Sequence, residues 1–516
     1  MAGPSPTLGL HRIAIGFGAA SLVSLGVLLS AKILWVVTIF QKPGEMISPA
    51  AANVYIARRV QQGGKLYGDW RRRPHVPTWY GPALYLPPAY IGRWVHADVP
   101  GLYLIGRGIS LLATVGVIGL ILSVAARKSG GHPIFGWMMS AAFVTADEIL
   151  AFFDMAFRAD APSSFFTLLG LVAVWMSNRP GARYGSILIF GLAFLYKQTS
   201  VVGPLAVVLW LGFTGRRKDA IRYAAICGAG LLAYLVLMEV CTHGRFSLNS
   251  VQALRANTTL RTIPFMLFEV VRPTILPMSL AFFVLITEWI HRRWDLLTIA
   301  FAVSVVLTAA STYRDGSSIN YYMLPLAIAC LLAARRLGGW WRERYALPAA
   351  TGLAFAMILA AVRYVPQAAV CLLQFPARWQ TFQSRHEQNR EKADFLRQLS
   401  NYLNQLPGPV LCQFNDLVLY CPRSILVDTC TFSGMADVGV FDDRELIEQL
   451  RRGEVAAIVF DPKMPKRYHS TDGFSQRWLQ AMEGRYERVA RFKWAEIYRP
   501  IERPRDAPEA DGSPGG

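Results

Sequence analysis

The sequence contains few charged residues for its length. Only 17% of the 516 residues are Asp, Glu, Lys or Arg, whereas a soluble protein carries about 25%. Hydrophobic residues make up 53% of the chain. This scarcity of charge argues against an ordinary soluble globular protein and indicates a polytopic membrane protein.

Acidic residues are the scarcer of the two signs. The chain has 34 Asp and Glu against 53 Lys and Arg, which gives a formal net charge of +19. Much of this excess is the usual Lys and Arg content of cytoplasmic loops. The remaining basic residues suit phosphate or anionic lipid as a partner. Because they are scattered between apolar stretches and form no continuous soluble face, we expect no nucleic-acid partner.

Several common motifs are missing from the sequence. We find no Gly-rich phosphate loop, so no nucleotide site is predicted, and no His pair has metal-ligand spacing. The seven cysteines form no disulfide framework. A Cys412–Cys421 disulfide is one alternative if this part of the chain lies in an oxidising compartment.

Eleven apolar stretches occupy the first 370 residues, and we predict that each is a transmembrane helix, which needs about 20 apolar residues. They are 13–40, 102–126, 133–153, 162–177, 184–197, 200–214, 222–241, 264–289, 296–312, 319–334 and 347–368. Counting from a cytoplasmic N-terminus places every short basic loop in the cytoplasm, as membrane proteins prefer. The sequence therefore predicts an integral membrane protein with a cytoplasmic N-terminus.

The predicted organisation begins with a transmembrane domain at 1–370. Within it, 41–101 is a long first outer loop, where the apolar and aromatic stretch 82–96 is too short to span and is predicted to be an interfacial helix. Residues 371–501 are predicted to form a small extracytoplasmic α/β domain, because short apolar runs alternate with helical patterns. The Pro-, Gly- and acid-rich tail 502–516 is predicted to be disordered.

Acids and bases gather in the loops that this topology places outside. Glu45 follows Pro43 and Gly44, which end the first span and leave the carboxylate at the membrane surface. It is either a general base or an exposed juxtamembrane acid. Asp154 and Arg158 are four residues apart and share a helical face. They either line a cavity or form a surface pair that stabilises a helix by about 0.2–0.5 kcal/mol.

Four stretches, in order, resemble one family. They read NVYIARRVQQGGKLYGDWRRRPHVPTWYGPALY (53–85), FFDMAFRADAPSSFFTLLGL (152–171), FLYKQTS (194–200) and YRDGSSINYYMLPLA (313–327). This order resembles the outer loops of integral-membrane GT-C glycosyltransferases, which use polyprenyl-phosphate sugars. The nearest group is that of the protein O-mannosyltransferases and lipid A aminoarabinose transferases, and the resemblance covers the chain to about residue 335.

The resemblance implies a GT-C-like fold and a hexosyl- or pentosyltransferase of the cell envelope. It would move a sugar from a polyprenyl-phosphate donor to a lipid, protein or polysaccharide acceptor at the extracytoplasmic face. Many relatives have an Asp-Glu pair after the first span, whereas this chain has Gly44-Glu45. The base therefore stays open between Glu45 and Asp69.

The donor phosphate would be bound by the remaining outer polar residues. These are Asp154, Arg158, Asp160, Lys197, Arg314 and Asn320. A phosphate leaves as a stable anion and needs no general acid, so one carboxylate suffices and the displacement inverts the anomeric centre. The cofactor is left open, because Asp154 and Asp160 have hard oxygen ligands that would suit Mg²⁺ or Mn²⁺.

Two other classes of function compete with this interpretation. A transporter or flippase of a lipid-linked or anionic substrate would carry charges at mid-bilayer depth and show internal repeats; we find no repeat, and the charges gather at the outer ends of the predicted spans. A non-catalytic glycan-assembly subunit would act through its C-terminal domain and would tolerate substitution of Glu45 and Asp160.

Overall fold

The computed structural model describes residues 6–40, 42, 44–45, 49–127, 133–146, 155–177, 179–254, 262–312, 319–462 and 473–501. It divides the chain into two compact units. Unit 1 comprises Met1–Asp69 and Pro77–Asp394, and unit 2 comprises Trp70–Val76 and Phe395–Gly516. The predicted tail at 502–516 lies outside the described residues.

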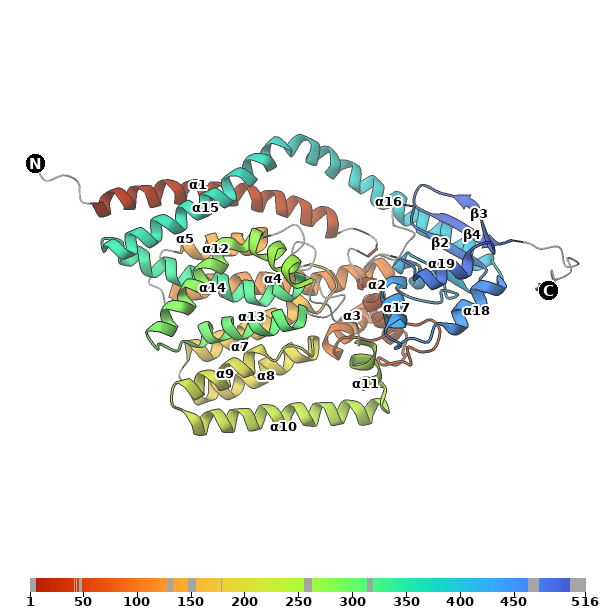
Figure 1. Ribbon diagram of the computed structural model, residues 1–516, viewed down its shortest axis with the longest axis horizontal. Helices are drawn as coiled ribbons and strands as arrows, with labels where there is room; N and C mark the ends of the chain where they lie inside the picture. Colours follow the sequence, from red (N-terminus) through yellow and green to blue (C-terminus); the bar gives the residue numbers. More distant parts are fainter. Residues whose placement is uncertain are drawn as a thin grey trace, which may run out of the picture. The chain divides into compact units, whose positions relative to one another are not determined.

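Unit 1 is a helical bundle, and most of its long helices lie side by side with similar axis directions (Figure 1). Each of the eleven predicted spans overlaps one helix. These helices are α1 (Pro6–Phe40), α4 (Val99–Arg127), α5 (Ile134–Thr145), α7 (Asp160–Met176), α8 (Pro180–Tyr196), α9 (Val202–Phe213), α10 (Arg217–Thr242), α12 (Thr262–Ile290), α13 (Leu296–Thr312), α14 (Met323–Arg342) and α15 (Leu347–Leu373). A helix satisfies its own backbone hydrogen bonds, as a segment in lipid must.

Six helices in the described part of the chain are long and apolar enough to cross a membrane. They lie in α1, α4, α10, α12, α14 and α15. Other apolar helices, such as α5 and α9, are shorter. The membrane character of the chain is therefore confirmed, while the count of eleven spans stays a prediction.

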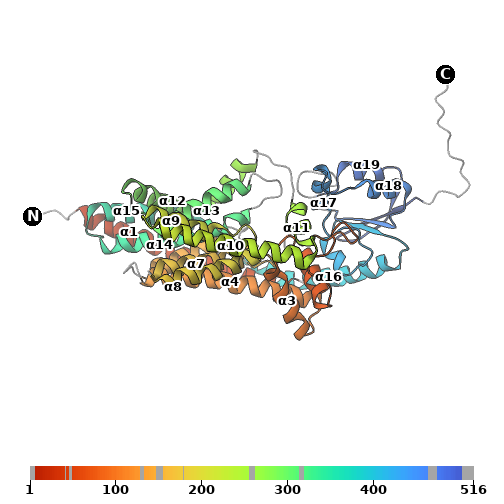
Figure 2. The same cartoon turned by 90° about the horizontal axis from the view of Figure 1, so that it is seen from below.

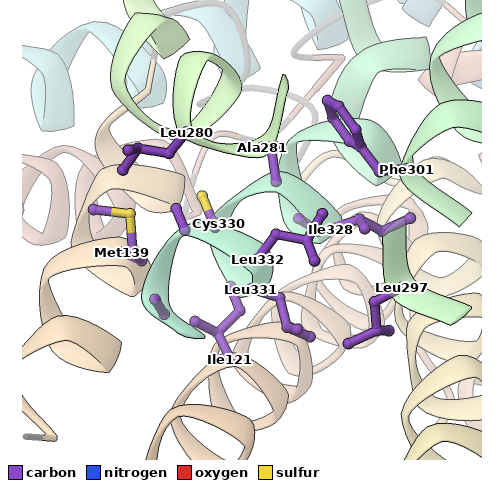
Figure 3. Close-up of a cluster of buried hydrophobic side chains, with 14 of the residues drawn as sticks. Ile121, Met139, Leu280, Ala281, Leu297, Phe301, Ile328, Cys330, Leu331 and Leu332 are labelled. Carbon is purple, nitrogen blue, oxygen red and sulfur yellow. The ribbon is translucent and has the colours of Figure 1, made fainter. Parts of the chain in front are cut away.

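The centre of the bundle is α14. In its most apolar stretch 78% of the residues are buried, against none in α10. Ile328, Cys330 and Leu331 of α14 pack among side chains of four other helices (Figure 3). Helix α14 also contains the small residues Ala327 and Ala329, and small residues let neighbouring helices approach closely. By contrast, α1 lies at the edge and packs beside α15 in both views (Figures 1 and 2).

Two short helices, α2 (Ala50–Gln61) and α3 (Pro82–Trp94), lie between α1 and α4. Helix α3 confirms the helix predicted at 82–96. One side buries Leu84 and Ala89, whereas Tyr90 and Trp94 are exposed, Trp94 to 83%. An exposed apolar surface on so short a helix suits the bilayer interface, and that location stays a prediction.

Unit 2 contains the small C-terminal sheet. Its strands are β1 (Val410–Cys412), β2 (Ala457–Phe460), β3 (Tyr486–Arg491) and β4 (Glu496–Pro500), in the order β1-β2-β4-β3. Strands β1 and β2 are parallel, and the other pairs are antiparallel. The helices are the end of α16 (Phe375–Gln405), α17 (Thr429–Asp437), α18 (Arg444–Arg452) and α19 (Gln476–Met482). An α/β domain was predicted, but the hairpin β3–β4 was not.

The thiols of Cys412 and Cys421 are free in the structure. Both residues are buried, and the Cys412 sulfur accepts a hydrogen bond from the Phe414 N–H at 3.2 Å. Unit 2 therefore packs without the disulfide that the sequence left as an alternative.

A segment of the loop between α2 and α3 completes unit 2. The backbone N–H of His75 donates to the Ile425 carbonyl at 3.0 Å, and the Arg73 guanidinium contacts Glu445 at 3.2 Å. The His75 ring lies edge-on to Phe441, with centroids 5.1 Å apart. Because residues 70–76 belong to this unit, the first loop and the C-terminal domain must lie on the same side of any membrane that the chain crosses.

Candidate active site

A buried polar cluster surrounds Asp160, the first residue of α7. Its Oδ1 accepts from the Lys197 Nζ at 2.6 Å and from the Asn320 Nδ2 at 2.7 Å. Its Oδ2 accepts from the Arg158 Nε at 3.1 Å. Only 1% of the Asp160 side chain is exposed, and 13% of that of Lys197. Arg158, Lys197 and Asn320 therefore all contact Asp160, and all four residues were predicted to bind the donor phosphate.

Local structure explains why these side chains meet. Asp160 opens a helix, where the helix dipole favours a carboxylate. Lys197 follows the last residue of α8, and a 2.5 Å hydrogen bond between the hydroxyls of Ser163 and Ser200 joins the start of α7 to the turn after α8. Asn320 lies in the 3₁₀ helix η2 (Ile319–Tyr322) that precedes α14.

Two cations, Lys197 and Arg158, contact the carboxylate of Asp160. The Lys197 ammonium also lies 4.1 Å from the centroid of the Tyr321 ring. The Asp160 carboxylate, 2.6 Å from this ammonium, favours its charged form. Two cations that lie this close together are suited to binding a phosphate by charge-assisted hydrogen bonds.

An unsatisfied acceptor lies in the same cluster. The Oδ1 of Asn320 is buried and has no hydrogen-bond partner among the described residues, although its Nδ2 is bound to Asp160. Buried polar atoms nearly always find a partner. A ligand with a hydroxyl group next to its phosphate could donate to this oxygen while its phosphate contacts Lys197 and Arg158.

The first outer loop contributes Tyr80 to the cluster. The Arg158 Nη2 donates to the Tyr80 hydroxyl oxygen at 3.3 Å, which leaves the phenol hydrogen to be donated elsewhere. The next residue, Gly81, donates its N–H to the Tyr196 carbonyl at 3.4 Å. A Cβ at Gly81 would lie 2.1 Å from the Leu195 carbonyl oxygen, so only glycine allows this approach.

Gly81→Ala should therefore displace Tyr80 from Arg158. Overpacking of this kind costs about 1–3 kcal/mol of stability, and the loss of Tyr80 from the cluster should weaken donor binding. Thermal unfolding in detergent and donor titration would measure the two effects. Gly191→Ala is the matched control, because nothing lies within 4 Å of a Cβ there. Unchanged donor binding in Gly81→Ala would show that Tyr80 is not part of the site.

Glu45 lies at the start of α2. Its Oε1 accepts the Ala51 N–H at 3.1 Å, a position where a helix attracts a carboxylate. Within the same helix, the Asn53 Nδ2 donates to the Phe157 carbonyl at 2.8 Å. Helix α2 thus contacts Glu45 through Ala51 and contacts Phe157, the residue before Arg158, through Asn53.

Arg107 supports the Glu45 loop and was not predicted. This fully buried residue of α4 donates to the carbonyls of Phe40 at 2.9 Å and Lys42 at 2.5 Å, and also to that of Gly44. One turn further along α4, the Ser110 hydroxyl donates to the Ala156 carbonyl at 2.6 Å. Residues three apart share a helix face, so one face of α4 holds both the Glu45 loop and the Arg158 segment. The signal in the sequence was an arginine inside a predicted span, which usually has a function.

Arg107→Lys should misplace Glu45 without disturbing the phosphate-binding cations. A lysine cannot reproduce the planar fork of an arginine toward several acceptors, and a shift of 1 Å in a reacting group can cost roughly 10²-fold in rate. We expect single-turnover sugar transfer to fall while donor affinity is retained. Equal losses of binding and transfer would instead indicate a general structural role.

The other predicted residues are placed differently. The Gly68 carbonyl accepts from the Asn249 side chain at 2.8 Å. The backbone beside Asp69 is therefore held by α11 (Arg245–Ser250), whereas the Glu45 loop is held by Arg107 of α4. Asp154 and Arg314 lie outside the described residues. Their predicted roles in donor binding stay predictions.

In the described part of the chain, the Asp160 carboxylate is bound by the cationic side chains of Lys197 and Arg158. Both of its oxygens already accept from Lys197, Asn320 and Arg158, and a divalent ion would have to displace two positive charges. Among the described residues no three His, Cys, Asp or Glu side chains form a metal-binding group. Asp154, the other acid considered as a metal ligand, lies outside the described residues, and the question of a cofactor stays open.

The helical bundle, the helices in the first loop and the appended sheet together define a fold of the GT-C type. Two crystal structures of ArnT from Cupriavidus metallidurans share it, one in the apo state and one bound to undecaprenyl phosphate. Their TM-scores are 0.55 and 0.52, at 16% and 15% identity, and each comparison covers 92% of this chain and 97% of ArnT. The likeness confirms the GT-C fold that the sequence predicted. No protein-family profile and no curated protein matches the sequence.

Proposed function

We propose that this chain is a membrane glycosyltransferase that takes its sugar from a polyprenyl-phosphate donor. The observation that carries the proposal is the cluster of Arg158 and Lys197 on one Asp160, with the unsatisfied Asn320 oxygen beside them. This arrangement suits a ligand that is both a phosphate and a sugar. The fold shared with ArnT, of which one structure is bound to undecaprenyl phosphate, supports the same donor class.

The cations bind the leaving group in this mechanism. As the bond from the anomeric carbon to the phosphate oxygen breaks, negative charge builds on the phosphate, and Lys197 and Arg158 stabilise it. Fixed charges in a dry site are effective because they need no reorganisation during the reaction. Asp160 holds the two cations in place, so we assign it a positioning role and not that of a base.

Glu45 is the proposed general base. It removes the proton from the acceptor hydroxyl, or orients an acceptor amine, as the acceptor attacks the anomeric carbon. The proton passes to the carboxylate and the electron pair of the broken bond leaves with the phosphate, so the displacement balances without a second acid. A single displacement inverts the anomeric centre. Glu45 is favoured over Asp69 because α2 and α4 connect it to the Arg158 segment.

We place this site on the extracytoplasmic face of the bacterial inner membrane. The basic short loops support a cytoplasmic N-terminus. The sharing of residues 70–76 by the loop and unit 2 supports a periplasmic C-terminal domain on the side of Glu45. The acceptor at this face is a lipid, protein or polysaccharide of the cell envelope.

A search for a missing glycan tests the function. Mass spectrometry of envelope lipids, proteins and polysaccharides should find one glycan absent from a deletion strain, restored by the wild-type chain and not by Glu45→Gln. Loss of lipid-linked sugar translocation with no glycan missing would instead favour a flippase. Restoration by Glu45→Gln and by Asp69→Asn alike would favour a non-catalytic subunit.

A further inference from the structure

A second site lies at the end of the bundle remote from Glu45. A cavity of about 220 Å³ is formed by the first half of α1, the starts of α5 and α15 and the end of α14. Gly18, Met138 and Met357 contribute to its lining, and every other lining side chain is also apolar. Glu45 follows the opposite end of α1, so this cavity is separate from the candidate active site.

The cavity is suited to a hydrocarbon chain. An apolar cavity of about 150 Å³ already binds benzene and stays free of water, so one of 220 Å³ holds several methylene groups. Its walls belong to helices that include three of the candidate membrane spans. In a bilayer, the apolar molecules available to enter between such helices are lipid chains.

A polar rim borders the cavity at Trp341. The Arg344 guanidinium lies 5.1 Å from the Trp341 ring centroid and donates to the Trp341 carbonyl at 2.9 Å. On the α1 side, the His11 ring is 5.2 Å from the Trp341 ring. The Nδ1 of His11 is buried and has no partner in the described part of the chain. A cation and an unsatisfied imidazole nitrogen thus lie beside the mouth of an apolar cavity.

We propose that this site holds an anionic phospholipid, with one acyl chain in the cavity and its phosphate at Arg344 and His11. The proposed topology places this end of the bundle in the cytoplasm, where basic pockets between membrane helices bind anionic headgroups. The site does not depend on the proposed transferase activity. Its occupant would fill the space between α1 and its neighbours and stabilise this peripheral helix.

Native mass spectrometry of the full-length protein in detergent tests the proposal. The probes are palmitoyl-oleoyl phosphatidylglycerol and the phosphatidylcholine with the same chains. We expect preferential binding of phosphatidylglycerol. Arg344→Gln should weaken that binding about fivefold, since a basic residue contributes about 1 kcal/mol toward an anionic lipid surface, and should leave phosphatidylcholine unchanged.

Gly18→Leu tests the cavity itself. A Cβ at Gly18 would lie 3.2 Å from the flexible Met357 side chain, so a leucine would fill the space and should reduce binding of both lipids. Gly230→Leu on α10 is the control, because its Cβ would meet nothing within 4 Å. Phosphatidylglycerol binding unchanged in both Arg344→Gln and Gly18→Leu would overturn the proposal. The proposal would also be overturned if undecaprenyl phosphate, and no other lipid, displaced the bound phosphatidylglycerol, because the cavity would then be assigned to a polyprenyl lipid. Sugar transfer is measured separately through Glu45.

Discussion

Replacing Glu45 with Gln is expected to lower sugar transfer by about 10²- to 10⁴-fold, the usual contribution of a general base. The substitution keeps the size of the side chain and its ability to accept the Ala51 N–H, but removes the basicity. Donor binding should therefore persist while transfer is lost. Release of polyprenyl phosphate from a purified donor, followed under single-turnover conditions, measures the chemical step.

Asp69→Asn is the comparison for this prediction. Asp69 is the other acid that the sequence offers, and its neighbour Gly68 is held by Asn249. If activity persists in Glu45→Gln and vanishes in Asp69→Asn, the base is Asp69. The proposed donor class and fold would remain in that case, because the described contacts of Asp160 involve neither acid.

Replacing Lys197 with Gln is expected to lower transfer by roughly 10²- to 10³-fold, as when one preorganised donor to a developing anion is removed. The cluster would then lose the ammonium that contacts the Asp160 Oδ1, which is one of the two cations proposed to bind the phosphate. Both donor affinity and the rate of the chemical step should fall, which distinguishes this variant from Glu45→Gln. Donor titration and single-turnover transfer would separate the two.

Lys65→Gln is the matched control for Lys197. Lys65 belongs to the first loop and is exposed, so its removal also deletes one positive charge but leaves the cluster intact. A similar loss in both variants would indicate that general attraction to anionic lipid, and not the Asp160 cluster, accounts for donor binding. No loss in Lys197→Gln would remove this residue from the mechanism.

The polar cluster could be predicted only as a list of residues. Arg158, Asp160, Lys197 and Asn320 were identified because they lie at the outer ends of predicted spans. Their shared hydrogen bonds could not be predicted, since a carboxylate near a membrane can be a base, a metal ligand or the partner of a cation. Contacts between segments up to 160 positions apart decided that Asp160 holds cations.

Other features were missed for a physical reason of the same kind. Arg107 lies within an apolar span, and the sequence does not indicate its partners. Only the structure shows that it binds carbonyls of the loop that follows α1 and contains Glu45. The hairpin β3–β4 was not predicted because most of β3 is exposed and polar, with no apolar run to mark a buried strand. The membership of residues 70–76 in unit 2 depends on pairing with a segment some 350 positions away.

The membrane class and the helical bundle were determined by the sequence itself, because local composition and hydropathy decide which segments can enter lipid. The interfacial location of residues 82–96 and the sided distribution of charge stay predictions from the sequence. Tertiary structure decided which acids and bases meet, which glycine and arginine position them, and where a cavity remains between helices. Those outcomes depend on packing between distant segments, for which hydropathy along the chain contains no information.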